Sequence, residues 1–306
     1  MTDVAAREAY RDALVALMHD DPRVWCVDTD TGLFAGVDFG AAGARYLDLG
    51  IAEQNLVGVA AGLAASGQIP FVNTMAAFAG TRALEQVKID VAYNALPVRI
   101  VATHGGLSAG HLGPTHHALE DLATMRMLPN LTVVVPADAA QTRIAVRAIA
   151  PLSGPAYLRL GRKATPAIPE APFLLGAPQV LRRGDDAVVF ACGALPVQLA
   201  LAAAEALLAE RIATTVVNVH TVKPLDAAAI AALSRGRIVV TVEDHWRTGG
   251  LGGAIAELLS EVAPAFVHRI GVGDTFATAA GDHEWLLAQH GVSAGAIIEA
   301  VRRRRP

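Results

Sequence analysis

Short runs of apolar and β-branched residues alternate along this chain with longer segments in which small and apolar residues recur at helical spacing. The run 98–103 is almost entirely apolar, which is typical of a strand buried on both faces of a sheet. This alternation predicts mainly parallel sheets covered on both faces by helices. In the first half we predict strands at 24–28, 71–74, 98–103, 132–135 and 156–160, and helices at 52–66, 78–95, 118–127 and 139–150.

The segment 165–178 interrupts this pattern. It holds four prolines within fourteen residues and no periodicity, which predicts a linker. We therefore predict two consecutive three-layer α/β domains, 1–165 and 180–306, joined by a linker at 166–179. In the second domain we expect strands at 187–191, 214–219, 238–242 and 267–270, helices at 196–210, 227–233 and 252–262, a loop at 243–251 and two terminal helices.

Composition narrows the class of protein. Of the 306 residues, 53% are hydrophobic and 18% are charged, which excludes a disordered chain, a collagen and a coiled coil. The apolar surplus suggests a large subunit interface. A net charge of −4 argues against nucleic-acid binding.

No apolar run is long enough for a membrane span and no secretory signal is evident, so we expect a cytoplasmic protein. Cys26 and Cys192 lie in apolar runs, which predicts buried thiols in a reducing compartment.

Candidate functional residues follow predicted strands, where open α/β sheets carry their ligand-binding loops. Glu53 opens an otherwise apolar helical segment. One interpretation is an exposed acidic residue in a first helical turn, which the helix dipole favours. The other is a buried carboxyl with a raised pKa, which can hold or share a proton.

A loop rich in glycine and histidine, 103–117, follows the apolar strand. It contains four of the ten histidines of the chain together with four glycines. Glycine lets the backbone approach a ligand, and histidine exchanges protons near neutral pH. A flexible surface loop and a metal site are the alternatives. The loop lacks the His-x3-His spacing of a helical metal site, and no cysteine or carboxylate occurs in it before Glu120.

Two basic residues, Arg162 and Lys163, follow the strand at 156–160. They are either exposed charges at a strand end or a clamp for an anionic group such as a phosphate. The glycines of 250–253 are weakly similar to a dinucleotide-binding loop. Because the preceding strand ends far upstream and no well-spaced acidic residue follows, we do not predict a dinucleotide site.

Taken together and in this order, the motifs resemble the C-terminal half of transketolase, which comprises a pyrimidine-binding domain and a smaller C-terminal domain. The likeness covers nearly the whole chain. Gly50–Asn55 resembles the family's glutamate motif, and Thr74–Phe78 resembles its aromatic segment. Thr103-His104 with Gly113–His116 resembles its substrate-histidine loop, and Gly161-Arg162 resembles its phosphate-binding arginine. Thr241–His245 with Gly249–Gly252 resembles the signature of its C-terminal domain.

The resemblance implies thiamine diphosphate as cofactor, with Mg²⁺ or Ca²⁺ holding its diphosphate. In this family an aspartate of a Gly-Asp-Gly motif and a downstream asparagine bind the metal, and both belong to the other half of the enzyme. The present sequence has no Gly-Asp-Gly, so a hard cation lacks its oxygen ligands on this chain. The resemblance therefore implies half of an active site. A second chain similar to the N-terminal half would supply the metal site, in an α2β2 heterotetramer.

The resemblance also implies roles toward the cofactor. Glu53 would hydrogen-bond N1′ of the aminopyrimidine ring, favour its imino tautomer and so act in catalysis. Phe78 would stack on that ring. Met75 stands where the family usually carries an aromatic residue beside the cofactor, and Asp30 aligns with a cofactor-proximal aspartate.

On the substrate side, His104 and His116 would bind substrate oxygens and shuttle protons, and His111 would also contact the substrate. Arg162 would anchor a sugar phosphate. The implied reaction transfers a two-carbon ketol group from a ketose, expected to be phosphorylated, to an aldose. Leu112 stands where the family usually has an aspartate that contacts a donor hydroxyl, which implies a branched, deoxy, amino or sulfonated sugar, or an α-keto acid, as donor.

Three other functions remain open at this stage. Two share the cofactor: a subunit similar to 1-deoxyxylulose-phosphate synthase, and one similar to the β chain of a 2-oxoacid dehydrogenase. The third is a partner-binding or regulatory subunit without catalysis, against which an intact Glu53 argues.

Overall fold

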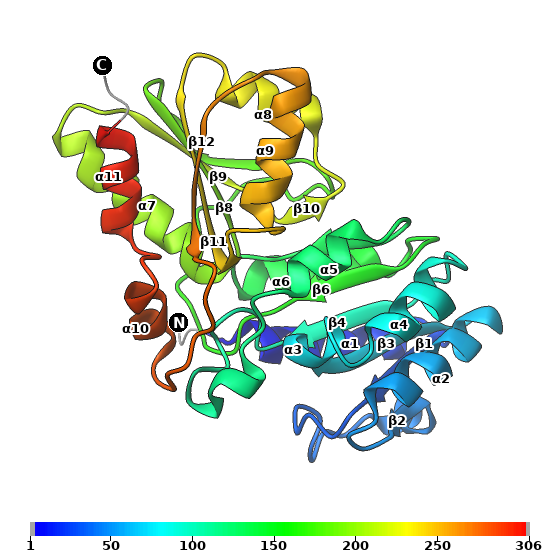
Figure 1. Cartoon of the computed structure of the whole chain (residues 1–306). Helices are drawn as coiled ribbons and strands as arrows, with labels where there is room; N and C mark the ends of the chain where they lie inside the picture. Colours follow the sequence, from blue (N-terminus) through cyan, green and yellow to red (C-terminus); the bar gives the residue numbers. More distant parts are fainter. Residues whose placement is uncertain (1–3, 304–306) are drawn as a thin grey trace.

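Two β-sheets organise residues 4–303, the part of the chain that the computed structural model describes (Figure 1). Every strand pair is parallel except one at an edge of each sheet, so the expected class of two α/β domains with mainly parallel sheets is confirmed. The order of the first sheet is β10 (Thr221–Lys223), β5 (Thr132–Val134), β6 (Ala156–Arg159), β4 (Arg99–Thr103), β3 (Ile69–Met75), β1 (Val24–Asp28) and β2 (Tyr46–Asp48).

Helices cover both faces of the first sheet because its strands turn alternate side chains to opposite sides. On one face, α1 (Ala6–Asp20) packs beside α6 (Ala139–Ile149), and Tyr10 and Leu14 are fully buried there. The other face carries α2 (Glu53–Ala65), α5 (Asp121–Met127) and the segment between β3 and β4.

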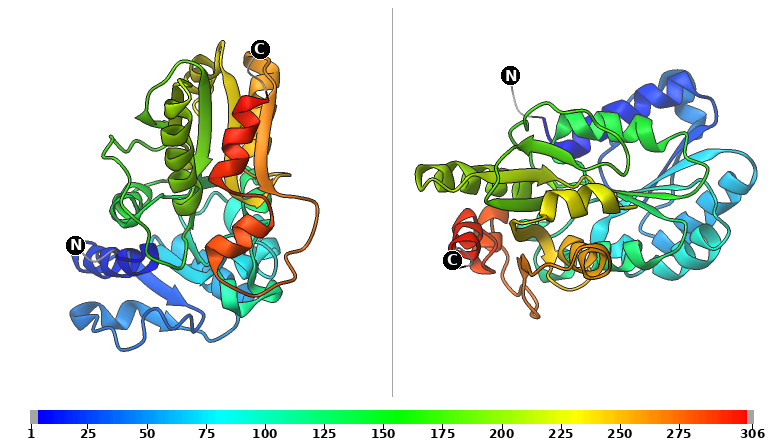
Figure 2. Two further views of the ribbon diagram at one scale, coloured as in Figure 1. Left: turned by 90° about the vertical axis from the view of Figure 1, so that its left-hand side faces the viewer. Right: turned by 90° about the horizontal axis from the view of Figure 1, so that it is seen from above.

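The second sheet has the same three-layer construction (Figures 1 and 2). Its strands are β12 (Val267–Val272), β11 (Ile238–Trp246), β8 (Ala187–Cys192), β9 (Thr214–Asn218) and β7 (Gln179–Arg182), in that order. Helices α7 (Ala194–Ala209) and α11 (Ala294–Arg302) lie on one face, α8 (Ala227–Ser234) and α9 (Leu251–Val262) lie on the other, and α10 (His283–Gln289) precedes α11.

The two lobes are joined by shared core and by shared sheet. One apolar cluster extends from α2 and the first sheet to α8 and α9 of the second lobe. Strand β10 leaves the second lobe and pairs with β5 of the first sheet. The predicted linker therefore connects two bodies that are packed on each other. Cys26 and Cys192 are buried free thiols, as expected, and none of the helices formed by residues 4–303 is long and apolar enough to cross a membrane.

The predicted helix at 78–95 is wrong. The segment instead forms α3 (Ala76–Ala79), a turn, α4 (Leu84–Gln86) and a π-helical stretch, η2 (Val87–Ala92). The turn begins at Gly80, where an added Cβ would lie 3.0 Å from the Cα of Asp121. The chain bends at this close contact and does not continue as one long helix. Phe78 lies on the short α3, directly after β3, at the carboxyl edge of the sheet.

Other boundaries also differ from the prediction. Helix α1 and the strands β2, β7 and β10 were not predicted. The three strands are only three or four residues long and lie at sheet edges, so they show little periodicity. The helix predicted from 118 begins at Asp121, since Ala118 still pairs with Gly106. The loop predicted from 243 is wrong in its first part, because β11 continues to Trp246.

Candidate active site

The predicted site residues lie along one edge of the first sheet, at the carboxyl ends of five neighbouring strands. Parallel strands direct these ends to the same side, which is where open α/β sheets bind ligands. Following the strand order from β6 through β4, β3 and β1 to β2, the residues that come next in the chain are Arg162, then His104, then Met75 with Phe78, then Asp30, and finally Glu53 at the start of α2.

Glu53 is buried, with only 2% of its surface exposed, which excludes the interpretation of an exposed acidic residue. Its Oε2 accepts a hydrogen bond from the Arg82 guanidinium at 2.7 Å. A buried carboxylate needs such a partner, because desolvation disfavours an unpaired charge. The same guanidinium lies over the ring of Phe78, with Cζ 4.3 Å from the centroid. Arg82 thus joins the carboxylate to the aromatic ring.

His104 is held in one orientation at the end of β4. It has a left-handed backbone (φ 61°), 5% exposure and a contact of 2.8 Å between Nδ1 and the Thr103 hydroxyl. Burial, the largest cause, and the charges of Arg162, Arg7 and His116 together lower the pKa of His104 to about 4. The imidazole is therefore neutral at pH 7 and can accept or donate one proton.

The structure brings His116 to the same place. It lies on a short turn, η4 (Pro114–His116), and its ring meets Phe78 edge-on at 5.3 Å. His111 is exposed on η3 (Gly110–Leu112), and no hydrogen bond or ring contact within residues 4–303 joins it to this cluster. Leu112 beside it is 43% exposed.

The two basic residues after β6 are separated by the fold. Arg162 is half-buried and its charge acts on His104. Lys163 points elsewhere and forms an ion pair with Asp282 of the second lobe. Two arginines were missed by sequence reasoning: Arg7 from the unpredicted α1, and Arg82 from the turn after α3. Neither belongs to a local motif, so only the tertiary contacts identify them.

The edge between β1 and β2 is acidic. Asp30 is exposed, has a left-handed backbone (φ 54°) and donates its backbone N–H to Asp48 at 3.1 Å. Burial is the largest cause of a pKa of about 6 at Asp28; the charge of Asp48 also raises the pKa, and the hydrogen bond from Thr31 lowers it. In the part of the chain that the structure describes, no group of three or more His, Cys, Asp or Glu side chains is arranged to hold a metal ion.

The glycines at 250–253 start helix α9, and a carboxylate of the chain already binds that helix end. Glu243 accepts the backbone N–H of Leu251 at 2.6 Å and that of Gly252 at 2.8 Å. An added Cβ on Gly250 would lie 1.9 Å from Glu243. These glycines therefore make room for an internal cap where a dinucleotide-binding loop would hold a phosphate.

Family profiles match both lobes. Residues 2–167 match the profile "Transketolase, pyrimidine binding domain", and residues 176–297 match "Transketolase, C-terminal domain". Together these matches cover most of the chain, and β10 is the one strand of the first sheet that lies in the second match.

Individual relatives of similar length are also known. The chain is 39% identical over 300 residues to the 6-deoxy-6-sulfo-D-fructose transketolase subunit SqwH of Clostridium sp. (strain MSTE9), covering 96% of this chain and 92% of that one. It is 39% identical over 303 residues to an apulose-4-phosphate transketolase subunit of Phocaeicola vulgatus, covering 97% and 96%.

Solved structures agree in fold. A structure described as a split gene transketolase, inactive β4 tetramer, superposes with a TM-score of 0.88 and 42% identity, covering 98% of each chain. Transketolase of Campylobacter jejuni superposes with a TM-score of 0.84 over 99% of this chain and 47% of its own, at 20% identity.

Proposed function

The chain belongs to the transketolase family, and we propose that it is the C-terminal-half subunit of a two-chain, thiamine diphosphate-dependent transketolase. The observation that carries this proposal is the buried Glu53, joined through Arg82 to Phe78 on the carboxyl edge of the first sheet. The domains we propose are a pyrimidine-binding domain at 1–165, a linker at 166–179 and a C-terminal domain at 180–306. The profile matches at 2–167 and 176–297 support this division.

The residues around Glu53 suit an aminopyrimidine ring. The Arg82 guanidinium is planar, donates a hydrogen bond to the Glu53 carboxylate and lies over the Phe78 ring. A flat aminopyrimidine with a proton on its ring nitrogen offers the same two contacts. Arg82 is 45% exposed in its side chain, so it has room to move aside for such a ring.

When bound, thiamine diphosphate supplies the carbon nucleophile that accepts and then releases the two-carbon group. The chain's own residues manage protons and position. We propose that Glu53 holds a proton at N1′ of the pyrimidine and that Phe78 packs on the ring, with Met75 and Asp30 beside it. The neutral imidazole of His104 and the ring of His116 would bind substrate oxygens and exchange protons with them.

The proposed substrates are phosphorylated sugars. Arg162 and Arg7 both act electrostatically on His104, so two cations lie near the proposed sugar-binding histidines and suit a phosphate. The names of the relatives concern apulose-4-phosphate and 6-deoxy-6-sulfo-D-fructose. An unusual donor fits Leu112, whose apolar side chain cannot hydrogen-bond a donor hydroxyl.

We propose that a partner chain similar to the N-terminal half of transketolase carries Gly-Asp-Gly and binds Mg²⁺ or Ca²⁺ with the diphosphate. Among residues 4–303 the structure offers no cluster of metal-binding side chains. Most of the chain aligns with relatives named as subunits, and with about half of the C. jejuni transketolase chain. The assembly we propose is α2β2.

The variant Glu53→Gln tests the proton role. In the complex of both chains, it removes the ionisable oxygen but keeps the shape of the side chain, and Gln can still contact Arg82. We expect ketol transfer to fall by about 10²–10⁴-fold, the usual contribution of a positioned acid–base group. Hydrogen–deuterium exchange at C2 of the bound cofactor, followed by proton NMR, should slow to a similar degree.

Glu243→Gln is the matched control, because Glu243 is equally buried but caps α9 in the second lobe. It should leave C2 exchange unchanged. Normal C2 exchange and turnover in Glu53→Gln would contradict the proposed role of Glu53.

A further inference from the structure

The loop that carries His104 and His116 is anchored on the second lobe. Its neck closes where Gly106 and Ala118 exchange two backbone hydrogen bonds, at 3.0 and 2.9 Å. Strand β11 lies against this neck, and the N–H of Trp246 donates to the carbonyl of Leu119 at 3.1 Å. The loop therefore has a support that does not belong to its own sheet.

Asp244 is the central contact of this support. Its carboxylate accepts the backbone N–H of Leu107 at 2.9 Å and faces Nε2 of His283 at 2.8 Å, and 5% of the residue is exposed. A Cβ on Gly106 would lie 2.0 Å from Oδ2, so the carboxylate packs directly on the loop backbone. Burial alone raises the pKa of Asp244, but the charge and hydrogen bond of His283 and the charge of Arg159 hold it below its ordinary value. The acceptor is thus charged at neutral pH.

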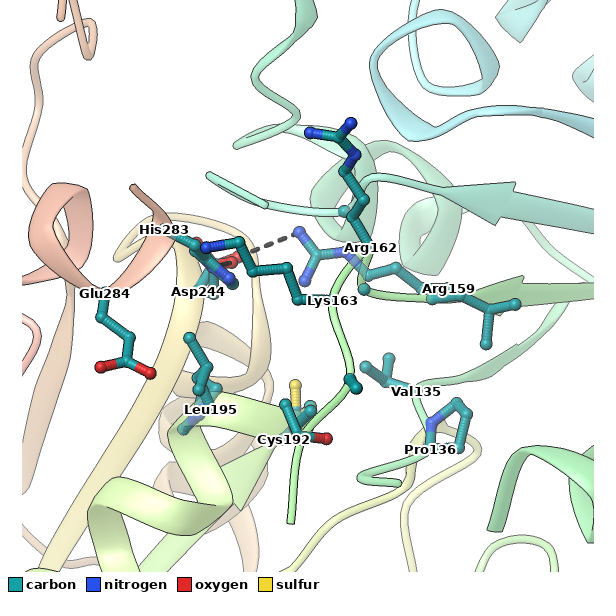
Figure 3. A pocket seen from close by; sticks show the side chains of 18 of the residues that line it. Val135, Pro136, Arg159, Arg162, Lys163, Cys192, Leu195, Asp244, His283 and Glu284 are labelled. Atoms are coloured by element: carbon teal, nitrogen blue, oxygen red, sulfur yellow. Dashed lines mark hydrogen bonds and ion pairs between the residues drawn. The ribbon is translucent and has the colours of Figure 1, made fainter. Parts of the chain in front are cut away.

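Arg159 ties Asp244 to the far end of the loop. Its guanidinium donates to the carbonyl of Ala118 at 3.0 Å and to the backbone carbonyl of Asp244 at 2.9 Å. It also pairs with Asp121, the first residue of α5, at 2.8 and 3.0 Å. Figure 3 shows the Arg159 side chain extending toward Asp244 and His283, whereas Arg162 points away from them. One buried cation therefore connects the loop end, the next helix and β11.

We propose that Asp244, supported by His283, is a positioning residue: from the second lobe it fixes the position of the loop that carries the proposed substrate-binding histidines. This inference rests on the proposed function and gives the C-terminal domain a part in the reaction. Asp244 acts through the backbone of Leu107, three residues after His104. A displacement of about 1 Å in a substrate-binding group can lower the rate about 100-fold. Fixing both ends of the loop therefore favours catalysis, even though it requires buried charged groups.

Asp244→Asn in the complete two-chain enzyme tests this role, because it replaces the charged acceptor by an amide of equal size. We expect kcat/KM for the donor to fall by about 10- to 100-fold. The affinity for thiamine diphosphate should stay within about twofold, since Glu53 and Phe78 lie on other elements. Glu243→Gln, which alters the neighbouring buried carboxylate without touching the loop, should leave kcat/KM within about twofold.

His283 gives a milder pair of variants in case Asp244→Asn folds poorly. His283→Gln keeps a donor toward Asp244 and should retain most of the activity, whereas His283→Ala removes it and should resemble Asp244→Asn. Amide hydrogen exchange over 104–118 reports on the loop independently of turnover, and it should accelerate in Asp244→Asn and His283→Ala only.

Unchanged loop exchange with unchanged kcat/KM in Asp244→Asn would overturn the positioning role. An equal loss of activity in Glu243→Gln would also overturn it, because the effect would then be a general weakening of the second lobe. A wild-type complex that lacks ketol transfer would instead refute the proposed function, whatever the loop exchange shows.

Discussion

At the residue scale, burial disfavours the charged forms of two titratable groups at the carboxyl edge. It raises the pKa of Asp28 to about 6 and lowers that of His104 to about 4. The opposite directions have one cause, since desolvation disfavours the charged form of an acid and of a base alike. The charges of Arg162 and Arg7 act in the same direction as burial on His104, and they suit the anionic sugar that we propose as substrate.

The protonation of His104 leads to a pH prediction. In the unfolded chain its pKa is near the ordinary 6.5, and in the folded chain it is about 4. Between these values the unfolded state binds a proton that the folded state does not, so the contribution of His104 to stability falls as the pH drops from 6.5 to 4. We expect its Cε1 proton to show no NMR titration between pH 8 and about 5.5.

The spectrum of His104→Gln assigns that signal by its loss. In the same variant, the free energy of unfolding should decline less steeply below pH 6.5 than in the wild type. A His104 titration midpoint near 6.5 in the folded protein would contradict the neutral imidazole.

Sequence reasoning identified the residues that local motifs mark, and missed those that only packing brings in. Glu53 was recognised as a candidate because an acidic residue opens an apolar helix, and its burial agrees with one of the two interpretations. Arg82 and Arg7 reach the site from a turn and from an unpredicted helix. Their side chains contact the site through tertiary structure, which no spacing along the chain encodes.

At the element scale, strands buried on both faces were predictable, and edges and irregular turns were not. The inner strands β4, β8 and β9 consist mostly of apolar or β-branched residues, so their positions follow from the sequence pattern. The helix predicted at 78–95 failed at Gly80, because the bend is set by contact with α5, a long-range constraint. The antiparallel β10 was not predicted, because a strand of three residues shows no periodicity.

The histidine loop also depends on a glycine, which predicts the effect of Gly106→Ala. Gly106 has φ +66°, and an added Cβ would lie 2.0 Å from Asp244. We expect a loss of more than about 1 kcal/mol in the free energy of unfolding, because both the backbone conformation and the space are wrong for alanine. Urea denaturation followed by circular dichroism measures this loss.

Gly67→Ala separates the two causes. Gly67 has φ +85° and nothing within 4 Å of an added Cβ, so it tests backbone strain alone. Gly106→Ala should destabilise clearly more than Gly67→Ala. Equal losses in the two variants would mean that the close packing of Asp244 on the loop contributes nothing.

At the scale of the whole molecule, part of the apolar surplus consists of large side chains exposed on the surface of the first lobe. Ile51, two residues before the start of α2, is 76% exposed, and Tyr93, which directly follows η2, is 81% exposed. Ile89 on the same π-helical stretch is 48% exposed, and η2 packs beside α2. Exposed large apolar side chains before α2 and on the stretch that packs beside it suggest that this face is covered in the working assembly.

That arrangement predicts how cofactor binding depends on assembly. Isothermal titration of thiamine diphosphate into this chain alone should show no Mg²⁺-dependent binding, because no metal-binding cluster exists among the residues described. Mixing with an N-terminal-half chain that carries Gly-Asp-Gly should create both Mg²⁺-dependent binding and ketol transfer, in a species whose mass by light scattering equals α2β2. Ile51→Asp should weaken this assembly while leaving the fold of the isolated chain intact, since Ile51 is exposed there. Activity or Mg²⁺-dependent cofactor binding by the isolated chain would show that it holds a whole site, and the two-chain proposal would then be wrong.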